Sequence, residues 1–346
     1  MKHGFGAIAV LIVAGSVAVG AQWPKHPASG APRDAQGNVQ MDGPAPRAAD
    51  GKPDLSGVWM RAESGPPRAG GPGRGRGQGP GGPGAPPSGG PPPGAGGPPP
   101  GPGGPPPPGA PGPAGGNGNA PFAGGRGGVV VEVQTERFPY DPSGPPIATF
   151  FEAGGNMEGG LPYTPWAAEL KKQRMAVVQK DNPDANCLPM GFLQFHQQPQ
   201  PRKIIQTPKM IVIAYEANYG LRYIYMDGRK LPEQGSVQPW WYGYSVGHWD
   251  GNDLVVETNN LRGAEESEFD GWLDVNGSPY SGQAKITERF RRVSYGHLQI
   301  DMTVEDAKAY TKPWTVRVDQ RILPDQELIE FVCNENQQFR RKIKID

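Results

Sequence analysis

The chain lacks several features that identify common classes of protein. Its 346 residues contain two cysteines, Cys187 and Cys333, which lie too far apart for a CxxC redox or zinc pattern. None of its five histidines stands in a His-x-His or HExxH spacing. Lysine and arginine number 34, as do aspartate and glutamate, so there is no basic excess for binding nucleic acid. We therefore predict no metal, no cofactor and no nucleic-acid partner.

Long apolar runs are also missing, apart from one at the N-terminus. The run AIAVLIVAGSVAVGA is short for a membrane span, and its end suits signal-peptidase cleavage before Gln22. No cysteine stands at this site for lipid attachment, and no twin arginine precedes the run. We therefore predict a cleaved signal peptide over residues 1–21, a periplasmic or extracellular location, and no stable membrane insertion after cleavage.

Export also predicts the state of the two cysteines. In an oxidising compartment, two widely spaced cysteines most simply pair, so we predict a disulfide between Cys187 and Cys333. Closing so long a loop stabilises a fold by roughly 3–5 kcal/mol in the chain-entropy model.

Glycine and proline are abundant, at 53 and 43 residues, and they gather in one segment. Residues 64–128 have almost no apolar side chains and no strict Gly-X-Y register, which predicts disorder rather than a collagen helix. The segment is either a spacer or a tolerated surface-loop insertion. The predicted organisation is a signal peptide (1–21), a loose polar leader (22–52), a first strand (53–63), the insert (64–128) and a β-rich domain (129–346).

The β-rich domain consists of paired runs of strand-forming residues separated by short turns. Four hairpins are expected, over residues 208–226, 242–259, 285–306 and 314–333. One helix is expected in TPWAAELKKQRMAVVQKD, with Thr164 as its N-cap and Pro165 at its first position. Consecutive hairpins predict a mainly β fold, an antiparallel meander that forms a closed barrel or a strongly curled sheet.

Polar residues on an apolar strand face mark candidate sites. Glu288 shares a face with Ile286 and Phe290, and we expect it to point into the barrel. There it either pairs with Arg222 or another arginine or is held partly protonated. By the same alternation, Glu216 falls on the face of Met210, Val212 and Ala214, and His248 falls on the face of Tyr242, Tyr244 and Val246. Such groups suit acid/base chemistry or the binding of a polar ligand, but strand ends and structural pairs produce the same pattern.

Several segments resemble a large family of exported bacterial proteins from environmental species. They are residues 53–59 (PDLSGVW), 186–191, 204–208, 225–233, 245–261 (SVGHWDGNDLVVETNNL), 271–281, 286–292, 309–316 (AYTKPWTV) and 331–336 (FVCNEN). The resemblance implies export and a shared architecture, and it omits the insert. Relatives often carry histidine where this chain has Tyr244 and Tyr280. Tyrosine can donate a hydrogen bond to a ligand but is a poor base near neutral pH, which favours ligand binding or tyrosine-assisted chemistry.

The segment DLSGVW also resembles the Gly-x-Trp signature on the first strand of lipocalin-like barrels. That resemblance implies that Trp59 closes one end of the barrel and stacks on a late basic residue, for which Arg340 and Arg341 are the candidates.

These observations lead to three functional hypotheses. The first is an exported lipocalin-like barrel that binds a small, partly apolar molecule. Its ligand-binding residues would be Tyr242, Tyr244, His248, Glu216, Glu288, Tyr280 and Arg222. The second is a hydrolase, lyase or isomerase that uses Glu288, His248 and Tyr244 as acid/base groups. The third is a structural, envelope-associated protein.

Overall fold

The structure is a computed structural model that describes residues 28, 30–64, 137–139 and 141–333. The predicted signal peptide, the first part of the leader, the insert beyond Ser64 and the candidate residues Arg340 and Arg341 lie outside the described residues. Ser64 itself belongs to β2 (Glu63–Ser64), which pairs in parallel with β3 (Arg137–Phe138).

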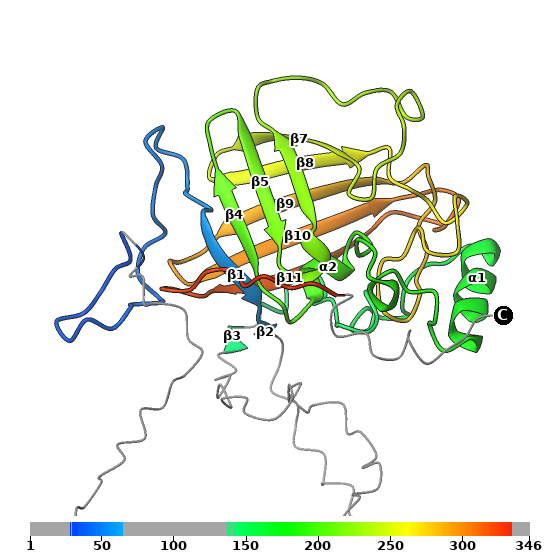
Figure 1. The fold of residues 1–346 in the computed structure, drawn as a ribbon, viewed down its shortest axis with the longest axis horizontal. Coiled ribbons are helices and arrows are strands. Elements are labelled where there is room, and N and C mark those ends of the chain that lie inside the picture. Colours follow the sequence, from blue (N-terminus) through cyan, green and yellow to red (C-terminus); the bar gives the residue numbers. More distant parts are fainter. Residues whose placement is uncertain (1–27, 29, 65–136, 140, 334–346) are drawn as a thin grey trace, which may run out of the picture. The chain divides into compact units, whose positions relative to one another are not determined.

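Nine strands form a closed barrel, as the sequence predicts (Figure 1). Around the barrel the order is β1, β11, β10, β9, β8, β7, β6, β5 and β4, and β4 pairs with β1 to close it. The strands are β1 (Gly57–Arg61), β4 (Arg202–Gln206), β5 (Met210–Tyr215), β6 (Leu221–Tyr225), β7 (Tyr244–Asp250), β8 (Asp253–Asn259), β9 (Lys285–Arg292), β10 (His297–Glu305) and β11 (Trp314–Ile322).

One pairing departs from the predicted antiparallel meander. β6 and β7 are parallel, and their register joins Ile224 to Ser245 and Tyr225 to Val246. Two consecutive antiparallel strands need only a short turn, whereas a parallel pair needs a longer crossover, which residues 226–243 provide. Because this pairing is short, β6 and β7 are not paired through their backbones beside Leu221 and Arg222. A gap is therefore left between the two strands at this point.

The predicted hairpin over residues 314–333 is wrong. Residues 327–333 form no strand, and β11 instead pairs with β1 through Trp59 and Ile322. The other three hairpins are confirmed, as β5–β6, β7–β8 and β9–β10.

The Gly-x-Trp segment lies on β1, and its tryptophan is buried beside a basic residue. Trp59 is fully buried, and its indole Nε1 donates to the carbonyl oxygen of Leu55 at 2.9 Å. The Arg292 guanidinium lies 4.9 Å from the centre of the Trp59 ring, a cation–π distance. Arg292, at the end of β9, is therefore a basic partner of Trp59, and the prediction for Arg340 and Arg341 is untested because both lie outside the described residues.

The leader is attached rather than loose where it is described. Arg33 forms two hydrogen bonds with the carboxylate of Asp325, at 2.6 and 2.8 Å. The backbone N–H of Tyr295 donates to the carbonyl of Gly43 at 2.7 Å, which fixes the leader beside the turn between β9 and β10.

The expected helix is present as α1 (Pro165–Ala176), and the hydroxyl of Thr164 accepts from the backbone N–H of Ala167. A second, short helix, α2 (Gln194–Gln197), has all four side chains buried. His196 of α2 contacts the inward-facing Glu288 and Gln320, so α2 fills part of the barrel interior. Within the described ranges, no helix is long and apolar enough to cross a membrane.

Candidate functional site

Glu288 points into the barrel, as its alternation on β9 predicts. It is fully buried, and both of its carboxylate oxygens accept hydrogen bonds from the Arg222 guanidinium, which lies on β6. The expected pairing with Arg222 is therefore confirmed. Arg222 is itself 1 % exposed, so the ion pair is removed from solvent.

His196 completes this arrangement, which we call the buried cluster: Glu288, Arg222 and His196. The imidazole Nε2 lies 2.7 Å from Oε1 of Glu288, and the side-chain amide of Gln320 donates toward Nδ1 over 3.4 Å. The two contacts fit a neutral ring that donates from Nε2 and accepts at Nδ1. Sequence analysis missed His196 because the four-residue α2 shows no periodicity that would indicate a buried face.

Charge and burial set the protonation of the cluster. Burial disfavours the charged carboxylate, but the Arg222 charge and the hydrogen bond from His196 outweigh it and hold the pKa of Glu288 at about 2. Burial lowers the pKa of His196 to about 4, against the opposing effect of Glu288. At neutral pH the cluster is therefore an anion, a cation and a neutral imidazole.

The remaining donors of Arg222 are also largely satisfied. Its Nη2 donates to the hydroxyls of Ser245 and Thr258 at 3.2 and 3.1 Å, and its Nε donates to Ser245 at 3.3 Å. The ring centres of Phe192 and Phe195 lie 4.7 and 5.7 Å from the guanidinium carbon. This environment holds the guanidinium rigidly at the gap between β6 and β7.

His248 does not join the cluster, so its predicted inward orientation is wrong. On β7 the inward positions are those of Ser245 and Gly247, while His248 is exposed. A Cβ atom at Gly247 would lie 2.6 Å from Sδ of Met226. The side chains of Ile224 and Met226 therefore fill the space beside Gly247, and Trp249, two residues further along β7, packs against the core.

Tyr244 lies on that outer face as well. It is half-buried, and its hydroxyl accepts a hydrogen bond from Nη1 of Arg229 at 3.0 Å. Its ring packs against those of Tyr225 and Trp240, at 5.2 and 5.6 Å between ring centres. Tyr244 therefore contributes to an aromatic surface outside the barrel and makes no contact with Glu288.

The predicted face of Glu216 is also wrong. On β5 the buried residues are Ile211, Ile213 and Tyr215, the opposite set from the one expected. Glu216 follows the strand, and its carboxylate accepts from the backbone N–H of Ile329 at 3.1 Å. Burial raises the pKa of Glu216. This carboxylate ties the C-terminal segment to the barrel and lies apart from the buried cluster.

Tyr280 is buried at 1 % exposure, but in the long connection between β8 and β9. Its backbone N–H donates to the carbonyl of Gly271, and its own carbonyl accepts from Ala264. Burial raises the pKa of its phenol. The backbone bonds make Tyr280 part of the packing of this connection, and it does not line the pocket described next.

A pocket of about 440 Å³ opens at the gap between β6 and β7, and we call it the seam pocket. It is lined by Pro189, Gly220, Leu221, Arg222, Tyr223, Tyr225, Trp240, Trp241, Tyr242 and Gly243. Half of these residues are aromatic, and Arg222 connects the pocket to the buried cluster. The volume lies within the roughly 300–1,000 Å³ typical of small-molecule sites.

Tyr242 is the lining residue with an unsatisfied polar group. Its hydroxyl is buried and has no hydrogen-bond partner, and its ring centre lies 5.5 Å from that of Tyr215. Gly243 has a φ of +63°, which breaks the alternation between Tyr242 and Tyr244 and turns Tyr242 inward. The inward position of Tyr242 was therefore predicted correctly, although the strand that follows was placed on the wrong face.

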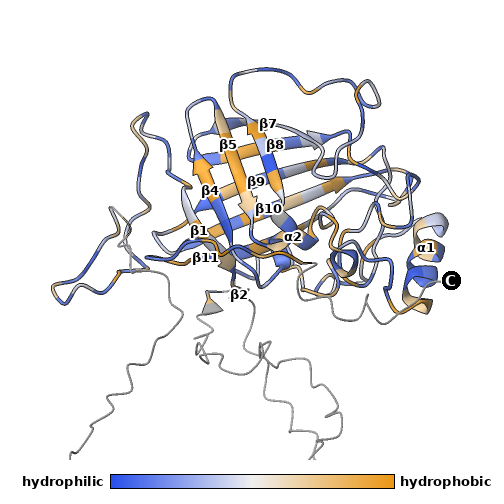
Figure 2. Cartoon of the chain, viewed as in Figure 1, coloured by the Kyte–Doolittle hydropathy of each residue, from blue (hydrophilic) through white to orange (hydrophobic). Residues whose placement is uncertain are grey.

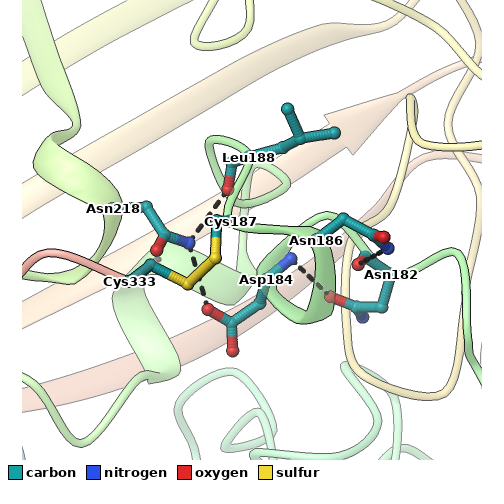
Figure 3. The surroundings of a disulfide bond; sticks show 7 residues. All are labelled: Asn182, Asp184, Asn186, Cys187, Leu188, Asn218 and Cys333. Atoms are coloured by element: carbon teal, nitrogen blue, oxygen red, sulfur yellow. Dashed lines mark hydrogen bonds between the residues drawn. A yellow bond between two sulfur atoms is a disulfide. The ribbon is translucent and has the colours of Figure 1, made fainter. Parts of the chain in front are cut away.

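The predicted disulfide is present. Cys187 and Cys333 are joined, with 5.6 Å between their Cα atoms (Figure 3). Beside them, the side-chain amide of Asn218 donates to Asp184 and to the carbonyl of Leu188, at 3.2 and 2.9 Å. The disulfide thus fixes the C-terminal segment to the turn η1 (Asp184–Asn186). In the part of the chain that the structure describes, no three histidine, cysteine or acidic residues are placed to hold a metal ion.

Comparisons of this chain with models of protein families, with curated proteins and with solved structures found no match.

Proposed function

We propose that the protein is an exported lipocalin-like barrel that binds a small, partly apolar molecule in the seam pocket. The closed β-barrel and the buried Gly-x-Trp strand support this assignment. Five aromatic residues provide the apolar walls, and Arg222 and Tyr242 provide polar groups at the inner end. A ligand with one acceptor group and an aromatic or aliphatic body matches this distribution.

The observation that carries the proposal is the Tyr242 hydroxyl. A buried hydroxyl without a partner costs about 1–3 kcal/mol, and phenylalanine would avoid that cost with the same ring. Retaining the hydroxyl beside an aromatic pocket is explained if a bound molecule accepts its hydrogen bond. Burial raises the pKa of Tyr242, so the group is a neutral donor at physiological pH.

The acid/base alternative receives less support from the same geometry. Glu288 is a buried acid inside the barrel, but both of its oxygens accept hydrogen bonds and its pKa is about 2. A general base works best with a pKa near the operating pH. His248 and Tyr244, the other proposed acid/base groups, lie on the outer face of β7. We therefore assign Glu288 the role of holding Arg222 in place.

The test measures binding of 8-anilinonaphthalene-1-sulfonate, an aromatic probe with an anionic group, by its fluorescence. Tyr242→Phe and Trp240→Ala should weaken binding, and Tyr242→Phe should leave the melting temperature unchanged or higher. Tyr310→Phe is the matched control, because the Tyr310 hydroxyl is buried but already donates to the carbonyl of Pro279 at 2.8 Å. That control should lose stability and bind the probe normally.

If both pocket variants bind the probe as tightly as the wild type, the seam pocket is not the site. Native mass spectrometry of protein purified from its own host complements the titration. A mass increment that is present in the wild type and absent from Trp240→Ala would identify the natural ligand.

A further inference from the structure

A second pocket, which we call the loop pocket, lies beside η1 and shares no lining residue with the seam pocket. It has a volume of about 240 Å³. It is lined by Phe150, Gln179, Asn182, Asp184, Ala185, Gln194 and Val275. None of the proposed ligand-binding residues contributes to it.

Two buried amides in its wall have fixed orientations. Asn182 and Gln194 are 4 % and 1 % exposed. Oδ1 of Asn182 accepts from the backbone N–H of Asp184 at 3.0 Å and from Nε2 of Gln194 at 3.1 Å. Because both of these donors require an oxygen at Oδ1, neither amide can be reversed without losing hydrogen bonds.

This arrangement leaves one donor and one acceptor unpaired in the same wall. Nδ2 of Asn182 and Oε1 of Gln194 are buried and have no hydrogen-bond partner. Each such group costs about 1–3 kcal/mol when it stays unpaired. Since the two amides are joined by a hydrogen bond, a single hydroxyl that accepts from Asn182 and donates to Gln194 would satisfy both.

The other lining residues define the rest of the ligand. Phe150 and Val275 supply an apolar surface, which suits the C–H face of a sugar ring. No lysine or arginine lines the pocket, and the carboxyl of Asp184 disfavours an anion. Hydrogen bonds from Asn218 and Gln198, both 3.2 Å long, already engage that carboxyl. The volume is also below the range for drug-sized molecules.

We propose that the loop pocket is a second binding site, for a neutral hydroxylated ring of monosaccharide size. The proposal is independent of the seam pocket and of its ligand. An ordered water has the same donor and acceptor capacity as a hydroxyl, so the experiment must separate a bound ring from a water alone.

The measurement follows the side-chain amide signals of Asn182 and Gln194 by ¹H–¹⁵N NMR of the full chain. The probes are glucose, galactose, mannose and myo-inositol, each titrated to millimolar concentrations. Ala185→Phe blocks the pocket from an exposed position without removing a hydrogen bond. Ala168→Phe is the matched control, because Ala168 is exposed on α1 and lines neither pocket.

At least one probe should shift both amide signals saturably in the wild type and in Ala168→Phe, and no probe should do so in Ala185→Phe. Gln194→Met removes one of the two contacts and should raise the dissociation constant about tenfold, read from the Asn182 signal. The proposal is overturned if no probe moves the signals in the wild type, which would leave the pocket to water. Shifts that persist in Ala185→Phe would overturn it equally.

Discussion

Replacing Glu288 with glutamine should destabilise the barrel far more than a conservative change normally does. The substitution keeps the shape of the side chain but removes the anion beside Arg222. If the amide oxygen takes the place of Oε1, the amide nitrogen then faces Nη2 of Arg222, and two donors meet. The guanidinium remains fully desolvated. Breaking a buried ion pair on one side costs about 3–5 kcal/mol.

For a domain of roughly 200 residues, that loss corresponds to a fall of about 6–20 °C in melting temperature. Urea unfolding and thermal denaturation, both followed by circular dichroism, measure it. The matched control is Glu257→Gln on the outer face of β8, where the carboxylate pairs with Lys285 at 2.8 Å in a half-exposed position. That variant should lose less than about 1 kcal/mol.

A double variant, Glu288→Leu with Arg222→Met, separates a lost charge partner from lost packing. Replacing both ions by apolar residues should recover most of the stability, because no unpaired charge remains. Ser245 and Thr258 keep a hydrogen bond between their hydroxyls, at 2.8 Å. If Glu288→Gln were as stable as Glu257→Gln, the Arg222 charge would have to be stabilised without Glu288. That result would refute the conclusion that the buried ion pair stabilises the barrel.

The pKa of His196 falls from 6.5 to about 4 on folding, so the unfolded chain binds the proton first. The free energy of unfolding should therefore decrease by about 3 kcal/mol as pH falls from 6.5 to 4. His196→Gln should remove this part of the pH dependence and His248→Gln should keep it; identical curves for the two variants would contradict the assignment. Reducing the Cys187–Cys333 disulfide, whose cysteines are 146 residues apart, should lower the free energy of unfolding by up to about 5 kcal/mol in the chain-entropy model. Unfolding curves with and without reductant test this, and superimposable curves would count against it. Gly220→Ala should cost about 1–3 kcal/mol through overpacking, because its Cβ would lie 2.1 Å from the Tyr242 hydroxyl. Adding Tyr242→Phe should restore part of the loss, and a failure to do so would place the clash elsewhere.

The sequence predicted strand faces well only where the two faces differ in polarity. On β9 the outward arginines Arg289 and Arg291 contrast with Ile286 and Phe290, and Glu288 was placed correctly. β5 is apolar along much of its length, so alternation could not decide which face was buried (Figure 2). On β7 the inward positions beside Arg222 carry small residues, Ser245 and Gly247, whereas Tyr244 lies outside, so the size and polarity of the side chains did not indicate the buried face.

Other parts of the site depend on contacts between distant segments. His196 reaches Glu288 from a four-residue helix whose pattern carries no periodic signal. The parallel pairing of β6 and β7, and with it the seam pocket, depends on the crossover of residues 226–243, which has no strand-like pattern. The contact between Arg292 and Trp59 likewise depends on the barrel geometry, and the positions of the two residues in the sequence do not indicate it.

The pairing of β1 with β11 sets an order on folding. Trp59 pairs with Ile322, and the backbone N–H of Leu323 donates to Val58, so the first and last strands of the barrel meet. Contacts between such distant residues form slowly, because the intervening chain must first be ordered. Until β11 is complete, β1 exposes one unpaired edge and β10 exposes another. A chain that crosses a membrane from its N-terminus would hold β1 in this open state until the last strand emerges. Pairing of these open edges with other chains is therefore most favoured in the interval before the final strand arrives.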